Sequence, residues 1–176
     1  MRKLKITELN RISTEEFKEV EKTPLIVVLD NIRSLNNIGS VCRTSDACLV
    51  EKIYLCGITA TPPNQEIHKT ALGAEHTVEW EYFKDTTDAV NELKNNGYTV
   101  YAIEQVENSI MLDKLETDSS KKYAVILGNE VKGVQQGAIN LCDECIEIPQ
   151  YGTKHSLNVS VTAGIVIWDF FKLLNK

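Results

Sequence analysis

Three short segments of the chain place glycines beside polar side chains whose chemistry could serve a binding site. Residues 36–43 read NNIGSVCR, residues 128–133 read GNEVKG, and residues 146–160 read IEIPQYGTKHSLNVS. Glycine allows a ligand or a second backbone to approach closely, and carboxylate, amide, hydroxyl and guanidinium groups can position a polar substrate. Whether the three segments meet depends on the elements that carry them.

Each segment follows an apolar run of the length expected for a strand that is buried on both faces. Such runs occupy residues 25–30, 52–56, 98–103, 123–127 and 145–148, and one further short strand is expected around residues 109–112. Helix-compatible segments separate them, at residues 38–48, 65–72, 85–95 and 134–140. This alternation predicts an α/β domain with a mainly parallel sheet flanked by helices, in which ligands bind outside the carboxyl ends of the strands.

A final helix is expected over about residues 156–174. It is apolar on nearly every face, so we expect the sheet and a second subunit to cover it. Ser156 and Asn158 lie at its N-terminus, where free amides and the positive end of the helix dipole can orient a polar ligand group. Taken alone, Ser156 is more typical of a helix cap.

The chain divides into an N-terminal arm, residues 1–22, and one domain, residues 23–176. The arm is basic at its start, and Ser13 with Glu16 matches a capping box ahead of a short helix. A length of 176 residues suits one well-buried core and is short for two.

The charge balance limits the kinds of nucleic-acid contact. A formal net charge of −6 argues against a broad basic face that clamps long nucleic acid, because phosphate contacts dominate the affinity of such proteins. A local basic patch remains open. Its candidates are Arg2, Lys3, Lys5, Arg11, Arg33, Arg43, Lys132 and Lys154.

Nothing in the sequence predicts export or a membrane span. The apolar stretch at residues 159–174 is short and is broken by polar residues that include Asp169 and Lys172, and no apolar signal region follows the basic start. We therefore expect a cytoplasmic protein whose five cysteines remain thiols.

The cysteines and histidines do not predict a metal site. Cys142 and Cys145 have the spacing of half a zinc site, but no second pair completes it. His68, His76 and His155 lack metal-ligand spacing, and we expect a surface or packing role for each of them. The prediction is that the protein binds no metal.

Each glycine-bearing motif is weak when taken singly. Asn37 is placed to cap a helix, and Arg43 lies six residues later, about 120° around that helix, so geometry alone does not unite them. The GNEVKG turn differs from GxGxxG, which argues against a Rossmann dinucleotide site and against the common Rossmann-like methyltransferase fold.

Together and in this order, the three segments resemble the SpoU/TrmH group of the SPOUT methyltransferases. The matching patterns are Asn37-x-Gly39-x-x-x-Arg43, Leu127-Gly128-Asn129-Glu130-x-x-Gly133 and Ile148-Pro149-x-x-Gly152-x-x-x-Ser156-Leu157-Asn158-Val159-Ser160. The resemblance covers about residues 25–174. It implies an S-adenosylmethionine-dependent enzyme that methylates a ribose 2′-hydroxyl of RNA, with tRNA slightly favoured over rRNA. It further implies a C-terminal deep trefoil knot (the SPOUT fold), which is a rare exception among folds, and a homodimer with each active site at the subunit boundary.

The resemblance also assigns the cofactor-binding residues. Gly128, Ile148 and Leu157 would contact S-adenosylmethionine largely through backbone atoms, and Leu127 would line the adenine pocket. The apolar ends of these two strands suit an adenine ring.

The resemblance assigns five residues to catalysis. Glu130, Ser156 and Asn158 would organise the pocket, Asn37 would hold the first motif, and Arg43 would reach the target ribose from the partner subunit. A general-base role for Arg43 requires a large depression of its pKa, which is ordinarily about 12.5 to 13.8. We therefore favour an electrostatic role, in which Arg43 grips a phosphate and stabilises the developing alkoxide.

The sequence departs from the family pattern at Gln150 and Val131, where methionine and glycine are common. These changes alter the pocket lining and remove no catalytic group. No separate N-terminal RNA-binding domain precedes the motifs, so target selection is expected to rest on the arm and the dimer surface. The alternative function is a non-catalytic RNA-binding or assembly module that retains the knotted cofactor pocket.

Overall fold

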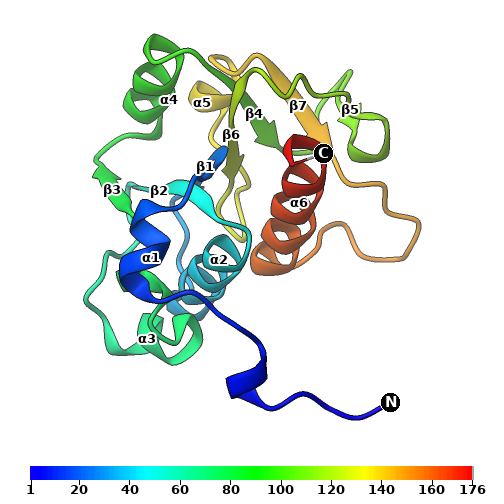
Figure 1. Ribbon diagram of the computed structural model, residues 1–176. Coiled ribbons are helices and arrows are strands. Elements are labelled where there is room, and N and C mark those ends of the chain that lie inside the picture. Colours follow the sequence, from blue (N-terminus) through cyan, green and yellow to red (C-terminus); the bar gives the residue numbers. More distant parts are fainter. Residues whose placement is uncertain (176) are drawn as a thin grey trace.

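The computed structural model describes residues 1–175. They contain one seven-stranded sheet whose neighbouring strands are all parallel (Figure 1). The order across the sheet is β3-β2-β1-β6-β4-β7-β5. The strands are β1 (Thr23–Asp30), β2 (Val50–Cys56), β3 (Trp80–Phe83), β4 (Tyr98–Ile103), β5 (Ile110–Met111), β6 (Lys122–Leu127) and β7 (Glu144–Glu147). This architecture confirms the predicted α/β domain with a parallel sheet.

Helices cover both faces of the sheet. They are α1 (Thr14–Glu19), α2 (Leu35–Ala47), α3 (Gln65–Ala71), α4 (Thr86–Asn95), α5 (Gln136–Ile139) and α6 (Val159–Leu174), with short 3-10 turns η1 (Ile6–Glu8), η2 (Ala74–His76) and η3 (Leu112–Lys114). One core unites α2 and α6 with side chains of β1 such as Val27, and the other unites α4 and α5 with those of the opposite face, such as Val28. Alternate residues of a buried strand therefore serve two separate cores.

The five predicted apolar strands are observed within two residues of their expected limits, because each is a buried apolar run. The short strand expected around residues 109–112 is observed as β5. The sequence analysis missed β3. This strand lies at the edge of the sheet, and Trp80 and Tyr82 are exposed by 38% and 48%, so it lacks the apolar signature of its neighbours.

Two predicted helix starts need correction. Ser34, not Asn37, caps α2, because the Ser34 hydroxyl accepts the backbone N–H of Asn37 at 3.3 Å and the helix begins at Leu35. Asn158, not Ser156, caps α6, since its Oδ1 accepts the N–H of Ser160 at 2.9 Å. Ser156 therefore belongs to the loop before the helix.

The predicted capping box of the arm is confirmed. The N–H of Glu16 donates to Ser13 Oγ at 3.1 Å, and the N–H of Ser13 donates to Glu16 Oε2 at 2.7 Å. These two bonds satisfy amides that would otherwise lack partners at the start of α1.

Within this chain the sheet covers only one face of α6. Phe170 is fully buried, with its ring centroid 5.6 Å from that of Tyr123. On the opposite face Val161, Ile165 and Trp168 are exposed by 51%, 39% and 54%. Their spacing of four and three residues makes them one apolar stripe along the helix.

Asp30 is a buried carboxylate at the carboxyl end of β1, with 1% of the residue exposed. It accepts the hydroxyl of Thr86 at 2.6 Å and the backbone N–H of Gln135 at 2.8 Å. The charge is thus compensated by hydrogen bonds that tie the starts of α4 and α5 to the central strand.

Within residues 1–175, no helix is both long enough and apolar enough to cross a lipid bilayer.

All five cysteines are free, as expected, and burial raises the pKa of Cys142 to about 12.

Gly39 allows α3 to pack directly on α2. A Cβ added there would lie 2.2 Å from the carbonyl oxygen of Ile67 and 2.2 Å from Thr70 Oγ1. We expect Gly39→Ala to lower the free energy of unfolding by about 1–3 kcal/mol, because the α3 backbone must shift. Urea denaturation measures this loss.

The matched control is Gly137→Ala in α5, where the nearest atom to an added Cβ is a methyl group of Thr87 at 3.4 Å. This change should leave the stability unaltered or raise it slightly, because alanine favours helix. Equal effects of the two substitutions would contradict the assigned close approach.

Candidate functional site

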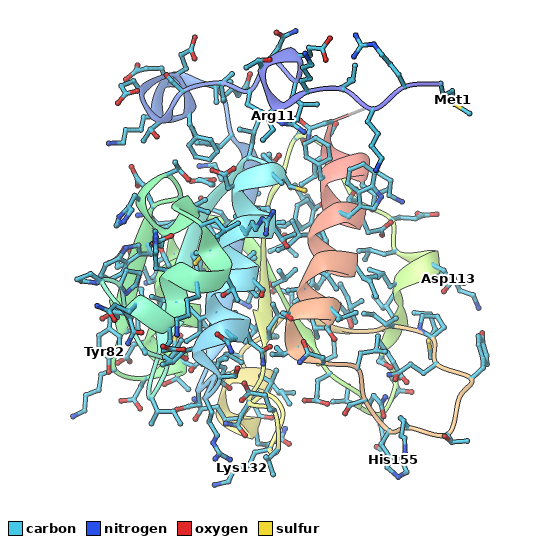
Figure 2. All side chains as sticks on the ribbon, turned by 90° about the horizontal axis from the view of Figure 1, so that it is seen from below. Met1, Arg11, Tyr82, Asp113, Lys132 and His155 are labelled. Atoms are coloured by element: carbon cyan, nitrogen blue, oxygen red, sulfur yellow. The ribbon has the colours of Figure 1, made fainter. Side chains whose placement is uncertain are left out.

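A cleft of about 650 Å³ opens at the carboxyl ends of β4, β6 and β7. This is the edge at which parallel sheets bind ligands, and the volume lies in the range of sites for small molecules. Figure 2 shows Lys132 and His155, which line the cleft, at one end of the molecule and Arg11 of the arm at the opposite end. The arm of a chain is therefore remote from that chain's own cleft.

All four residues predicted to bind the cofactor line this cleft. They are Leu127, Gly128, Ile148 and Leu157. Gly128 has a structural reason to be glycine, because an added Cβ would lie 2.1 Å from the N atom of Val134. The chain after β6 therefore folds back directly over residue 128 and leaves its backbone beside the cleft.

Asn129 organises that fold-back. Its backbone exchanges two hydrogen bonds with Gly133, at 2.9 and 3.0 Å. Its side chain accepts the N–H groups of Val131 and Lys132, both at 3.0 Å, and donates to the carbonyl of Asn31 at 2.7 Å. A single amide side chain thus shapes the turn and fastens it to the end of β1.

Glu104 borders the same turn from the end of β4. Its Oε2 accepts the N–H of Val134 at 2.9 Å, and its Oε1 accepts the N–H of Gln105 at 3.0 Å. Gly133 has a φ of +68°, a left-handed conformation that favours glycine, and an added Cβ would lie 2.1 Å from Glu104 Oε2 and so displace that side chain.

Glu130 joins the turn after β6 to the start of α2. Its carboxylate accepts the backbone N–H groups of Arg33 and Ser34, both at 3.0 Å, and the side-chain amide of Asn37 at 3.2 Å. Partial burial raises the pKa of Glu130, but these hydrogen bonds outweigh it and leave the pKa below its ordinary value. Glu130 is therefore an ionised group whose oxygens are engaged by donors.

A chain of hydrogen bonds continues from Glu130 to α6. Asn37 Oδ1 accepts the side-chain amide of Asn158 at 3.3 Å. The structure thus brings three of the five predicted catalytic residues into one network. Ser156 lines the cleft together with Glu130 and Asn158.

Arg43 lies apart from this network. It is exposed on α2, and within the described residues 1–175 it is not among those that line the cleft. Six residues separate it from Asn37, which corresponds to about 9 Å along the helix axis. One chain alone does not direct Arg43 into the site.

Sequence reasoning missed Asn129 and Glu104 as determinants of the site. Asn129 stood inside the quoted Leu127-Gly128-Asn129-Glu130 pattern, so its position between a glycine and an acid was an available signal. No sequence pattern singled out Glu104, because a lone acidic residue after an apolar strand is common. Its role depends on the neighbouring strand β6, which is distant in sequence.

The comparisons with known proteins agree with this geometry. The model of the SpoU rRNA Methylase family matches residues 24–168. The chain belongs to the SpoU rRNA methylase family. It is 33% identical over 163 residues to the tRNA (guanosine(18)-2′-O)-methyltransferase of Thermus thermophilus, covering 93% of this chain and 82% of that one.

Solved structures of this family share the fold. The A. aeolicus TrmH/SpoU tRNA modifying enzyme is 27% identical with a TM-score of 0.80, over 92% of this chain and 82% of that one. The AdoMet-bound rRNA methyltransferase from Sinorhizobium meliloti is 25% identical with a TM-score of 0.79, over 90% of this chain and 60% of that one.

The Glu130 bridge predicts a pH-dependent contribution to stability. Because the folded-state pKa lies below the ordinary 4.5, the contribution is present above 4.5 and is lost as the pH falls through the folded-state value. Glu130→Gln should lower the free energy of unfolding by about 0.5 kcal/mol at neutral pH, because solvent screens the exposed carboxylate and weakens its contacts. Urea denaturation should show this difference shrinking in acid.

The control is Glu107→Gln, which changes an exposed carboxylate outside the cleft. Glu107→Gln should change the free energy of unfolding little at neutral or at acid pH. A Glu130→Gln difference that stayed constant from neutral to acid pH would exclude the ionised carboxylate as its source.

Proposed function

We propose that this protein transfers a methyl group from S-adenosylmethionine to a ribose 2′-hydroxyl of RNA, with tRNA favoured over rRNA. The observation that carries the proposal is that Leu127, Gly128, Ile148 and Leu157 line one cleft beside the network of Glu130, Asn37 and Asn158. Family membership and the Thermus relative, named as a tRNA 2′-O-methyltransferase, support the reaction class.

The residues of the cleft fit this cofactor. Leu127, Ile148 and Leu157 offer apolar surface to an adenine ring, and the closely folded turn at Gly128 presents backbone atoms. Glu104 and Glu130 place negative charge in the lining, which suits a ligand that carries a positive sulfonium. When bound, S-adenosylmethionine supplies an electrophilic methyl group.

The chain's own residues position the nucleophile. Glu130 keeps the start of α2 against the cleft, and Asn37 and Asn158 fix each other's amide orientation, so polar atoms are ordered before RNA arrives. Ser156 adds a hydroxyl to the same wall. These residues organise the site, and we assign the stabilisation of the developing 2′-oxyanion to Arg43.

The proposal includes a homodimer in which Arg43 acts in the partner's cleft. Two observations support it. Arg43 is exposed and lies outside the cleft of its own chain, and Val161, Ile165 and Trp168 form an apolar stripe on α6 that suits burial against a second copy. In a dimer with two-fold symmetry, each contact between the stripe and the other copy occurs twice, so a small apolar surface contributes twice to the interface.

The proposal also retains the deep trefoil knot of the SPOUT fold, for which family membership is the support. Residues 149–158 form the long loop ahead of α6, and the carbonyl of His155 accepts the side-chain amide of Gln105 at 3.1 Å. That contact fastens the loop across the cleft. A cytoplasmic location and a role of the arm in target selection stay predictions.

The direct test is transfer of labelled methyl from S-adenosylmethionine to total RNA from a strain that lacks the gene. Nuclease digestion should then yield a 2′-O-methylated nucleoside. A methylated base would overturn the reaction class. RNA binding without transfer would favour the alternative, a non-catalytic RNA-binding module that keeps the cofactor pocket.

Arg43→Ala should abolish methyl transfer while leaving cofactor affinity nearly unchanged, because the proposal assigns Arg43 to the target ribose and not to the cofactor. Turnover is measured with labelled cofactor and affinity by titration calorimetry. Leu157→Asp is the contrasting variant, since it places a charge in the apolar lining and should weaken cofactor binding. Loss of cofactor affinity in Arg43→Ala would show the assignment to be wrong.

Trp168→Asp should convert the dimer into an inactive monomer that remains folded, because Trp168 is 54% exposed in the single chain. Sedimentation velocity reports the mass and circular dichroism the fold. Ile58→Asp serves as the control, since Ile58 is 65% exposed away from the stripe and should leave the dimer intact. A fully active Trp168→Asp monomer would refute the shared site.

A further inference from the structure

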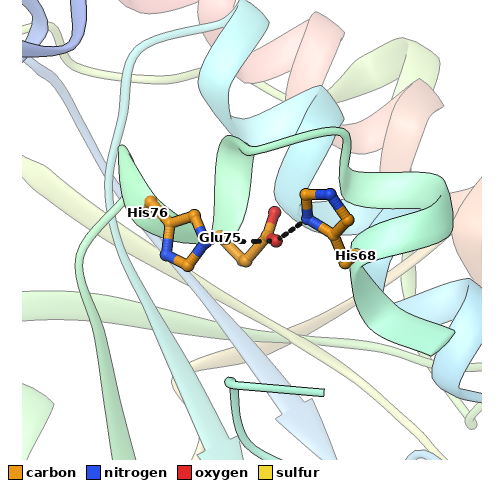
Figure 3. A group of neighbouring side chains, drawn as sticks. All are labelled: His68, Glu75 and His76. Carbon is orange, nitrogen blue, oxygen red and sulfur yellow. Dashed lines mark hydrogen bonds and ion pairs between the residues drawn. The ribbon is translucent and has the colours of Figure 1, made fainter. Parts of the chain in front are cut away.

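Two histidines and a glutamate meet at the turn between α3 and η2, outside the cleft (Figure 3). His68 Nδ1 lies 2.5 Å from Glu75 Oε1, and His76 Nε2 lies 3.5 Å from the same oxygen. One ligand-type atom from each residue falls within 4.8 Å of the other two. The rings lie on either side of the carboxylate, with their centroids 6.4 Å apart.

The backbone of the turn creates this arrangement. Leu72 ends α3 in the left-handed conformation with φ +53°, and Gly73 follows with φ +99°. Two successive left-handed residues reverse the chain, so that η2 returns toward the last turn of α3. The N–H of Gly73 donates to Glu75 Oε2 at 3.0 Å, which leaves Oε1 facing the two imidazoles.

The carboxylate and the rings differ sharply in exposure. The Glu75 side chain is 3% exposed, whereas those of His68 and His76 are 61% and 65% exposed. The buried Glu75 carboxylate thus lies between two imidazoles that open to solvent.

We propose that His68, Glu75 and His76 bind one divalent transition-metal ion of the zinc class. Two imidazole nitrogens and one carboxylate oxygen are a preferred ligand set for Zn²⁺, and three protein ligands leave the fourth position to water. The solvent-facing side of the rings provides that position. The sequence predicted no metal because the ligands are seven and eight residues apart, a spacing that only this turn makes compact.

One of the ligand distances already agrees with such a site, and a second requires a small movement. Bonds of about 2.0–2.2 Å to zinc place two tetrahedral ligands about 3.3–3.5 Å apart. The separation of His76 Nε2 from Glu75 Oε1 already has this value, at 3.5 Å. The His68 contact is shorter, at 2.5 Å, so the exposed His68 ring must move outward by roughly 1 Å to admit the ion.

A bound ion would fasten α3 to η2, two elements that both support α2. Gly39 of α2 receives the backbone of α3, and Thr77, just after η2, donates to Asp46 of α2 at 2.5 Å. The expected consequence is greater stability of this side of the domain. The inference stands independently of the methyl-transfer proposal.

The test is zinc titration of the full-length, tag-free chain after removal of metal with a chelator. Calorimetry should give one zinc ion per chain, and His68→Gln and His76→Gln should each weaken binding by at least roughly tenfold. Zinc should also raise the thermal unfolding midpoint of the wild type and leave that of the double variant unchanged. Both histidines are exposed, so these variants should fold, which circular dichroism verifies.

Two controls separate this site from other donors. His155→Gln removes the remaining histidine, and Cys142→Ser removes the one cysteine that is not fully buried; both should bind zinc as the wild type does. Undiminished binding by the double histidine variant would overturn the proposal. Loss of binding in either control, or no zinc binding by the wild type, would overturn it as well.

Discussion

The carboxylate of Glu130 is the contact on which the geometry of the site depends. It accepts backbone N–H groups from Arg33 and Ser34, residues 97 and 96 positions away in sequence. These amides precede the first turn of α2, where unpaired donors and the helix dipole both favour a negative charge. A single ionised side chain therefore sets where α2 begins relative to the end of β6.

The remaining order of the site follows from that bridge. Asn37 occupies the first turn of α2, so its amide reaches Glu130 on one side and Asn158 on the other. Asn158 in turn caps α6. The starts of two helices and the end of a strand are connected through three polar side chains, which fixes the cleft without burying a large polar network.

The sequence allowed the sheet and much of the site to be predicted. Buried strands can be predicted because their sequences are apolar runs, whereas β3 lies exposed at the sheet edge and its sequence is not such a run. Caps were less certain, because Ser34 and Asn37 are both good cap residues and only the hydrogen bond at Ser34 decides between them. The meeting of His68 with Glu75 depends on two left-handed residues, one of them a leucine that sequence rules do not place there. The role of Arg43 could not be read from its position in one chain, because it is exposed on α2 and is not among the residues that line the cleft.

The strand order has a consequence for how the chain acquires its shape. Leu25 of β1 pairs with Tyr123 of β6, so the centre of the sheet cannot close until most of the polypeptide has left the ribosome. The sixteen residues of α6 come last, and until they dock, the aromatic face around Tyr101 and Tyr123 has no cover. Burial of this aromatic face therefore waits for α6, the last of the described elements to leave the ribosome.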